Sequence, residues 1–287
     1  MQDAIGQVDP RSRPADRRGM TPALQIESRR WSDGETFGSL EAIAEETPVA
    51  LVYNGISHAV MMATPQDLED FALGFSLTEG ILERPEELLD CEAQATPQGI
   101  EMALTITSRR FAALSTRRRN LTGRTGCGLC GVDSLDQALR PLRGIWNEVI
   151  VSPAAVMRAM AALPKLQAIN REVHALHAAA WALPDGTVAE IREDVGRHNA
   201  LDKLLGRLAR AGVDSQGGFA VVTSRCSYEM VQKAVARGIG ILVAVSAPTA
   251  LALRLAEAAG LTLIARANGD GYRLYTHPHR IATRQAA

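Results

Sequence analysis

Alternating apolar positions predict β-strands in the first half of the chain. Apolar and polar residues alternate over Pro48 to Met62, interrupted in the middle by Asn54-Gly55. This dipeptide supplies the two positive-φ positions of a type I′ turn, so the stretch predicts a β-hairpin. Residues 100–107 alternate in the same way and predict a further strand.

A helix is expected between these strands. Thr64 is a suitable N-cap, and Asp67 stands where the carboxylate of a capping box belongs. Residues 66 to about 79 therefore predict a helix. Two hairpin strands, this helix and the later strand together predict a small α+β domain over residues 23–107.

Strand-like and helix-like blocks alternate in the second half of the chain. Apolar β-type runs over residues 219–223, 239–245 and 261–265 are separated by two helical patterns. Strands joined by single helices imply right-handed crossovers and a parallel sheet. A further helix is expected over residues 152–164. We therefore expect an α/β domain over residues 147–287.

Two segments lack the periodicity of strands or helices. Residues 108–146 combine an Arg-rich stretch with a Gly- and Cys-rich one, and we interpret them as a connecting loop. Residues 1–22 are rich in Asp, Arg and Pro, and we expect them to form a disordered tail.

Composition and charge exclude several classes of function. The net charge of −1 gives the chain no general attraction to nucleic acid. The sequence contains neither eighteen consecutive apolar residues nor the core of a signal peptide, so we expect no membrane insertion and no export. Four cysteines without an export signal indicate a reducing compartment, and we expect the protein in the cytoplasm.

The pair Cys127 and Cys130, within a glycine-flanked Cys-x-x-Cys motif, is the sharpest chemical feature. Such a pair suits half of a zinc site, a dithiol redox centre or a persulfide carrier. Zinc is disfavoured because the other close pair, His174 and His177, has a shorter spacing than zinc sites usually show. We therefore expect no permanently bound metal. The arginines that precede the pair favour the nucleophilic thiolate, although a solvated arginine-rich face explains them as well.

The carboxyl ends of the expected parallel strands offer a site for a ligand. Ligands of such sheets bind beyond these ends, where helix N-termini present backbone N–H groups to anions. Hydroxyl, arginine and glycine residues at these ends suit a phosphorylated ligand, and ordinary helix caps explain the hydroxyls equally well. The candidate residues are Ser224, Arg225, Ser246, Thr249, Arg266, Ala267, Asn268, Gly269, Asp270 and Gly271.

A third motif, Arg192 to Lys203, gathers charged and amide groups around one glycine at the start of a helical pattern. Its His198 suits a proton carrier, or a hydrogen-bonded structural histidine, which is the commoner case. The chain has three lysines, Lys165, Lys203 and Lys233. Lys203 and Lys233 fall within the motifs singled out here. The roles of Asp194, His198, Lys203 and Lys233 stay open.

Taken together, these motifs resemble the formate dehydrogenase accessory sulfurtransferases, the FdhD family. The resemblance extends in order over about residues 40 to 280. In the family's C-terminal stretch an aromatic residue usually stands at the position of Arg266 and an arginine at that of Asn268. The motifs that carry the resemblance are Cys127 to Gly131, His177 to Ala180, Arg192 to Lys203, Ser227 to Lys233 and Ser246 to Thr249, with Asn54-Gly55 and Ala72 to Gly80 in the N-terminal half.

The resemblance implies a fold and a function. It implies a cytidine-deaminase-like C-terminal domain joined to a smaller α+β domain, usually as a homodimer. It implies a carrier that takes sulfur from a cysteine desulfurase and passes it to the molybdenum bis(molybdopterin guanine dinucleotide) cofactor of formate dehydrogenase. Cys127 then holds the persulfide, Cys130 is its partner, and the stretch from Arg266 to Gly271 contacts the cofactor. A dithiol oxidoreductase and a cofactor chaperone with structural cysteines are the alternative functions.

Overall fold

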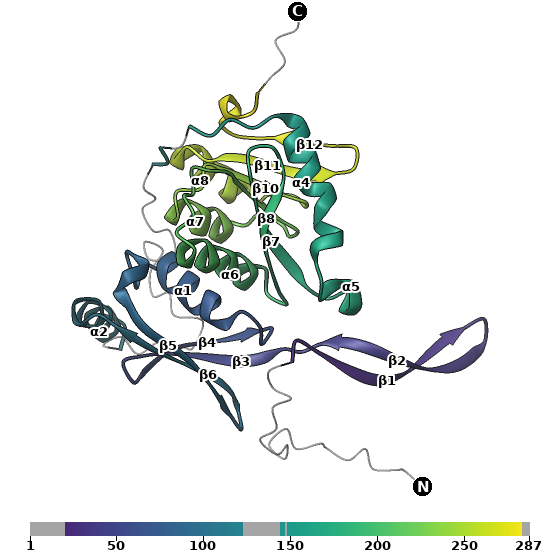
Figure 1. Ribbon diagram of the computed structural model, residues 1–287, viewed down its shortest axis with the longest axis horizontal. Helices are drawn as coiled ribbons and strands as arrows, with labels where there is room; N and C mark the ends of the chain where they lie inside the picture. Colours follow the sequence, from purple (N-terminus) through teal and green to yellow (C-terminus); the bar gives the residue numbers. More distant parts are fainter. Residues whose placement is uncertain (1–20, 123–143, 147, 283–287) are drawn as a thin grey trace, which may run out of the picture.

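The computed structural model describes residues 21–122, 144–146 and 148–282. Within them the chain forms a two-stranded sheet, a four-stranded sheet and a six-stranded sheet. Helix α1 lies on the four-stranded sheet, and helix α6 lies between α1 and the six-stranded sheet (Figure 1). The mixed α/β class expected from the sequence is confirmed.

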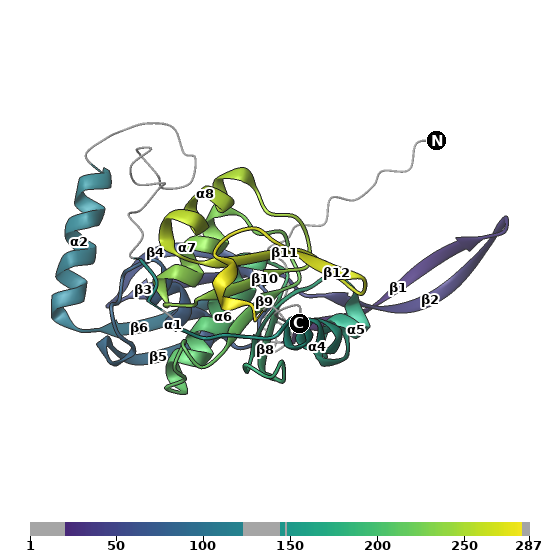
Figure 2. The same cartoon turned by 90° about the horizontal axis from the view of Figure 1, so that it is seen from above.

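The two-stranded sheet is a long hairpin that extends away from the rest of the chain (Figures 1 and 2). It comprises β1 (Ala23–Ser32) and β2 (Glu35–Ala44), which pair antiparallel in unbroken register from Ala23↔Ala44 to Ser32↔Glu35. We call this hairpin the arm. These residues belong to the expected small α+β domain, but their strands were not predicted.

The four-stranded sheet has the order β4-β3-β6-β5. The predicted hairpin is confirmed, because Asn54 and Gly55 adopt φ angles of 47° and 80° between β3 and β4. The predicted strand near residue 100 is confirmed as β6. The bounds are β3 (Thr47–Tyr53), β4 (Ile56–Ala63), β5 (Leu88–Thr96), preceded by η2 (Pro85–Glu87), and β6 (Gly99–Ile106).

Helix α1 (Leu68–Thr78) confirms the predicted helix but begins two residues later than expected. The predicted cap is wrong: Asp67 is in the left-handed region, and the N-cap makes no side-chain hydrogen bond. The hydroxyl of Thr64 instead accepts a hydrogen bond from the backbone N–H of Val195 at 3.1 Å. The Thr64 hydroxyl, which the local sequence predicts as the helix cap, is therefore used in a tertiary contact with Val195.

The expected loop over residues 108–146 is wrong in its first part, because Ser108–Thr122 form helix α2. Arginine, alanine and leucine are good helix formers. The segment was interpreted as a loop because its arginines leave no clear apolar periodicity. Arg110 is buried at the start of the helix and pairs with Glu87 and Glu83, each at 2.8 Å. The cysteine pair Cys127 and Cys130 lies outside the described residues, as do residues 1–20 of the expected tail.

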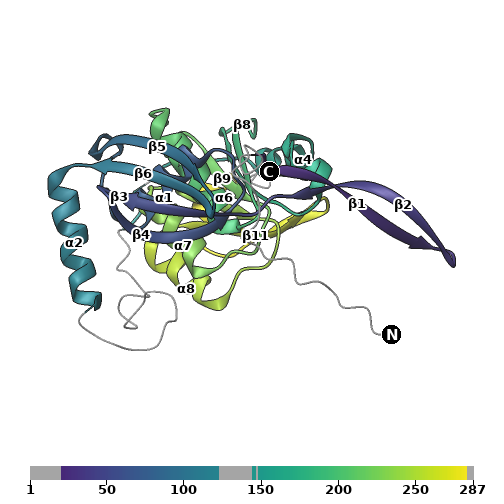
Figure 3. The same cartoon turned by 90° about the horizontal axis from the view of Figure 1, so that it is seen from below.

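The six-stranded sheet has the order β12-β11-β10-β9-β7-β8. Its strands β9, β10 and β11 are parallel, as predicted, and β7, β8 and β12 run antiparallel to their neighbours. Helices α6, α7 and α8 pack on one face and α4 on the other (Figures 1 and 3). Ser152 caps α4, confirming that helix start, by accepting from Ala155 N at 3.1 Å. The bounds are α4 (Pro153–Leu166), α5 (Asn170–Val173), β7 (His177–Ala182), β8 (Val188–Asp194), α6 (Arg197–Arg210), β9 (Phe219–Val222), α7 (Tyr228–Ala236), β10 (Ile241–Ala244), α8 (Ala250–Ala259), β11 (Thr262–Asn268), β12 (Gly271–Leu274) and η3 (Pro278–Arg280).

Helices α1 and α6 join the two main sheets at very close range. A Cβ atom added to Gly206 would lie 1.9 Å from the carbonyl oxygen of Asp70, and one added to Gly74 would lie 1.8 Å from that of Asp202. Only glycine allows backbones to approach so closely. The two glycines therefore hold the four-stranded sheet, through α1 and α6, at a fixed distance from the six-stranded sheet.

Candidate functional site at the strand ends

The structure brings the predicted strand-end residues together at one edge of the six-stranded sheet. Ser246 donates a backbone hydrogen bond to the carbonyl of Ser224 at 3.4 Å, and Arg266 donates one to the carbonyl of Ser246 at 3.1 Å. Arg225 and Arg266 are exposed at this edge. Hydroxyl groups and the Arg225 side chain thus follow β9 and β10, and Arg266 lies near the end of the neighbouring β11, an arrangement suited to an anionic ligand.

Two of the predicted hydroxyls are already engaged by the protein. The Thr249 hydroxyl caps α8 by accepting from Ala252 N at 3.2 Å, so the helix-cap alternative holds for this residue. Ser224 is buried, and its hydroxyl donates to the carbonyl of Arg225 at 2.9 Å. Both hydroxyls therefore have hydrogen-bond partners within the protein, and both residues stabilise the local structure at the strand ends.

The stretch from Arg266 to Gly271 forms the tip of a β-hairpin. Strand β11 continues through Asn268, which pairs with Gly271 of β12. Arg266 has a φ of 52° at a register shift within this pair of strands. The side-chain oxygen of Asn268 accepts from Asp270 N at 2.9 Å and closes the turn. The exposed tip holds Arg266, Asn268, Gly269 and Asp270, whereas Ala267 is buried.

His198 stands at the same edge with a partner that the sequence analysis did not identify. Its Nε2 lies 2.8 Å from Glu229 Oε2 and 3.4 Å from Ser227 Oγ. The His198 hydrogen bond lowers the pKa of Glu229, so this carboxylate stays ionised. The sequence did not predict this contact, because it joins the start of α6 to the start of α7, and these two helix starts are far apart in sequence.

Arg197 and His177 extend the polar edge next to His198. The buried Nε of Arg197 has no hydrogen-bond partner among the described residues. His177 begins β7, and burial together with the nearby Arg197 charge lowers its pKa, so it is neutral at pH 7. The first turn of α6 therefore adds a guanidinium and an imidazole to the arginines of the strand ends, and the start of β7 adds a second imidazole.

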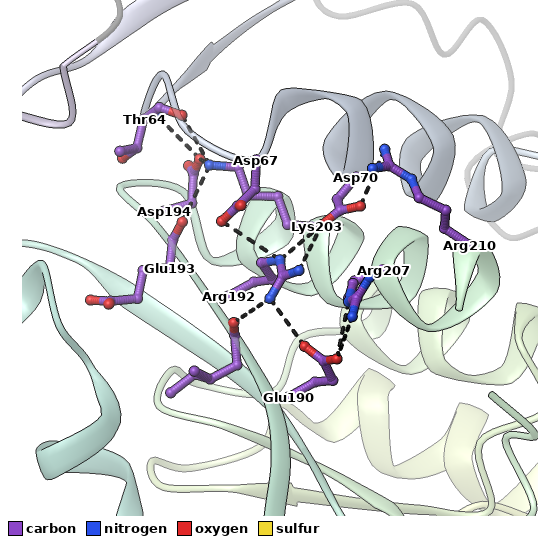
Figure 4. A network of polar contacts seen from close by, with 11 residues as sticks. Thr64, Asp67, Asp70, Glu190, Arg192, Glu193, Asp194, Lys203, Arg207 and Arg210 are labelled. Atoms are coloured by element: carbon purple, nitrogen blue, oxygen red, sulfur yellow. Dashed lines mark hydrogen bonds and ion pairs between the residues drawn. The ribbon is translucent and has the colours of Figure 1, made fainter. Parts of the chain in front are cut away.

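Most of the motif from Arg192 to Lys203 serves a different purpose, because it contacts helix α1 and the segment before it (Figure 4). Lys203 and Asp194 are both fully buried and form an ion pair at 2.7 Å. Lys203 also donates to the carbonyl of Thr64 at 2.9 Å, while the Thr64 N–H donates to Asp194 at 3.0 Å. Lys203 and Asp194 are therefore structural, and the density of charge in the motif reflects the contact of β8 and α6 with the segment before α1.

A second ion-pair cluster crosses the same interface. Arg192 pairs with Asp70 of α1 at 2.8 Å, and Arg210 reaches the other oxygen of Asp70 at 3.3 Å (Figure 4). Glu190 accepts from Arg207 at 3.0 Å on the exposed side of the cluster. These contacts fix the orientation of α1 against α6.

Lys233 of α7 makes a third contact, which joins α6 to the end of α1. It pairs with Asp202 of α6 at 2.8 Å and donates to the Thr78 hydroxyl at 3.0 Å. Thr78 in turn donates to Asp202 at 2.7 Å. Buried lysines that are this fully satisfied are structural elements, and nothing places them at the polar edge.

The two described cysteines are poor nucleophiles. Burial raises the pKa of Cys226 to about 12 and, as the largest cause, that of Cys91 to about 12. Because the thiolate is the reactive form, both remain protonated thiols at neutral pH. Both are free cysteines that pack against hydrophobic cores, which indicates structural roles.

Within the described residues, no three His, Cys, Asp or Glu side chains gather closely enough to hold a metal ion. In the same residues no helix is both long and apolar enough to cross a membrane.

The fold and the site define a mixed α/β protein with a cationic edge at the ends of its parallel strands. Residues 44–282 match the family model of the FdhD/NarQ family. The chain belongs to this family.

Relatives in several bacteria agree with this assignment. A protein named sulfur carrier protein FdhD from Cupriavidus necator is 52% identical over 252 residues, which cover 88% of each chain. One of the same name from Bordetella petrii is 52% identical over 244 residues, covering 85% of this chain and 88% of the relative. A crystal structure of a candidate formate dehydrogenase accessory protein from Desulfotalea psychrophila shares the fold, with a TM-score of 0.71 and 23% identity, covering 91% of this chain and 99% of that one.

Proposed function

We propose that this protein is a sulfur carrier required for formate dehydrogenase activity, and that Cys127 carries the sulfur as a persulfide. The observation that carries the proposal is its close relationship, at 52% identity, to proteins named sulfur carriers. The chain has four cysteines, and burial keeps Cys91 and Cys226 as unreactive thiols. By elimination, Cys127 and Cys130 are the pair on which a persulfide can form.

The proposed transfer balances as two thiol exchanges. The Cys127 thiolate attacks the outer sulfur of a persulfide on a cysteine desulfurase, and the donor cysteine leaves as a thiolate. Cys130 then attacks the inner sulfur of the Cys127 persulfide and releases hydrosulfide. The resulting Cys127–Cys130 disulfide needs a cellular thiol as reductant before the next cycle. In this proposal the protein acts as a sulfurtransferase in the cytoplasm.

The proposed acceptor of the sulfur is the molybdenum bis(molybdopterin guanine dinucleotide) cofactor, bound as a substrate before it enters formate dehydrogenase. Its phosphates and guanine rings suit the cationic edge formed by Arg225, Arg266 and the first turn of α6. The exposed tip from Arg266 to Asp270 offers backbone and side-chain groups to the same ligand. The homodimer expected from the resemblance stays a prediction.

The carrier is tested by loading it with sulfur. Cys127→Ala is expected to lose all mass gain of one sulfur atom after incubation with a cysteine desulfurase and cysteine, because the accepting thiolate is gone. Intact-protein mass spectrometry under non-reducing conditions measures this gain. Cys91→Ala is the matched control and keeps the gain. No gain in the wild-type protein would favour the chaperone alternative, and a desulfurase-independent disulfide cycle would favour the oxidoreductase.

The substrate site is tested with guanosine diphosphate as a probe, since it carries a guanine and a pyrophosphate. Arg225→Ala is expected to weaken binding about tenfold, because an exposed charge-assisted hydrogen bond is lost. Arg171→Ala, an exposed arginine on α5, is the control and leaves the affinity unchanged. Isothermal titration calorimetry measures both. Equal affinities for Arg225→Ala and the wild type would remove Arg225 from the site.

A further inference from the structure

An acidic side chain lies among the cationic groups of the strand-end site. Glu229 is in the first turn of α7, four residues after Arg225. Arg197 and Lys233 are close enough to act on its charge, and His198 contacts it directly. A carboxylate repels the phosphates that the surrounding cations suit. Its position is therefore explained either by a structural role or by a ligand group other than phosphate.

His198 holds the Glu229 carboxylate in a defined orientation while leaving part of it accessible. Nε2 of His198 lies 2.8 Å from Oε2 of Glu229, whose side chain is 43% exposed. The other oxygen, Oε1, has no hydrogen-bond partner among the described residues. The His198 hydrogen bond is the largest of the effects that lower the pKa of this carboxyl. Glu229 is thus an ionised acceptor with free lone pairs at neutral pH.

The structural carboxylates of the same helices differ from Glu229 in burial. Asp194 and Asp202 are 0% and 1% exposed, and both oxygens of Asp202 accept from Lys233. An ion pair as exposed as that of Glu229 contributes little to stability. Asp270 is also acidic and exposed at this edge, but no hydrogen bond to its carboxylate holds it within the described residues. Glu229 therefore combines access with a fixed orientation, as a ligand-reading group requires.

The bases of nucleotides differ in the groups that a carboxylate can bind. Guanine presents two neighbouring N–H donors, N1–H and the 2-amino group, and a carboxylate has acceptor sites for both. Adenine presents an acceptor, its N1, at the corresponding position. Phosphate contacts carry no information about the base. Arginines at the strand ends therefore suit any nucleotide, and selection for guanine needs a separate acceptor.

We propose that Glu229, oriented by His198, accepts hydrogen bonds from N1–H and the 2-amino group of a guanine and makes the strand-end site selective for guanine nucleotides. The inference rests on the proposed substrate, because it names the group that reads one of its bases. Arg225 and Glu229 are four residues apart, which limits the distance between their Cα atoms to about 14 Å. One nucleoside diphosphate can span the two side chains, with its phosphates at Arg225. In this arrangement His198 is a positioning residue.

The test compares the dissociation constants of guanosine diphosphate and adenosine diphosphate for the full chain by isothermal titration calorimetry. The wild type is expected to bind the guanine nucleotide about 10- to 100-fold more tightly, since one bidentate contact discriminates bases by that factor. Glu229→Gln is expected to lower this ratio about tenfold, because a neutral amide accepts only one of the two donors. Glu92→Gln, an exposed carboxylate of β5, is the matched control and keeps the ratio.

The ratio of the two affinities separates base reading from a structural role. Loss of a structural contact weakens both nucleotides equally, so a Glu229→Gln variant with the wild-type ratio overturns the inference. His198→Ala releases the carboxylate and is expected to lower the ratio as well, and an unchanged ratio in this variant overturns the positioning role.

Failure of the inference and failure of the proposed function give different results. A wild-type protein that binds both nucleotides equally overturns guanine selection and leaves the phosphate site in place. A wild-type protein that binds neither overturns the strand-end site as a whole. Sulfur loading of Cys127 is measured separately, so the sulfur-carrier function is judged independently of both results.

Discussion

Gly206→Ala is expected to lower the free energy of unfolding by about 3 kcal/mol or more. The added methyl group would lie 1.9 Å from the carbonyl oxygen of Asp70 and 2.8 Å from the backbone nitrogen of Gly74. Backbone atoms of two packed helices cannot rotate away, so α1 and α6 must separate. Urea unfolding followed by circular dichroism measures the loss, with Gly269→Ala, where the methyl group enters open space, as the control.

Whether Gly206→Ala lowers or raises the free energy of unfolding shows whether helix packing or helix propensity dominates at this position. Alanine is a better helix former than glycine by about 1 kcal/mol, so a helix in solvent gains stability from the change. A stabilised Gly206→Ala variant would contradict the close approach of the two helices. Gly74→Ala acts on the same contact, so the double variant is expected to lose less than the sum of the two single losses.

The elements that depend on local pattern were predictable from the sequence. Asn54-Gly55 determines its turn through backbone conformation alone, and three apolar runs separated by helices determine β9 to β11 as a parallel sheet. The arm escaped prediction because its apolar residues fall on both faces and show no single alternating stripe. The start of α1 was misplaced because the capping group, Thr64, is engaged by Val195, 131 residues away in sequence.

The candidate site was predictable in position but not in the roles of its residues. The rule that ligands bind at the ends of parallel strands located Ser224, Ser246 and Arg266 correctly at one edge. The density of charge that suggested chemistry at Lys203 is explained by its buried ion pair with Asp194 and by the hydrogen bond of Lys203 to Thr64. Its acceptor on Thr64 is 139 residues away, and no local pattern carries that information. Within that motif, Arg197 and His198 in the first turn of α6 lie at the edge.

Asp202→Ala is expected to destabilise the protein by about 3–5 kcal/mol, because it leaves the Lys233 ammonium buried without its main counter-ion. Lys233 is 7% exposed and Asp202 1%, so water cannot replace the lost partner. Urea unfolding at pH 7 measures the change. Arg109→Met is the control: it breaks an exposed pair with Glu83 at 3.6 Å and costs at most about 1 kcal/mol.

Lys233→Met removes the other partner and leaves the Asp202 carboxyl buried without its counter-ion. The stability of this variant is therefore expected to depend on pH. Burial raises the pKa of Asp202, against the opposing effects of Lys233 and the Thr78 hydroxyl, and without Lys233 that pKa rises further. A carboxyl whose folded-state pKa exceeds its unfolded value favours the folded state at low pH and loses that contribution as pH rises through the folded pKa. The stability gap between Lys233→Met and the wild type is therefore expected to narrow as pH falls from 7 to 5. A gap that stays constant over this range would show that Asp202 stays ionised without Lys233, and that Thr78 and the surrounding groups suffice to hold its charge.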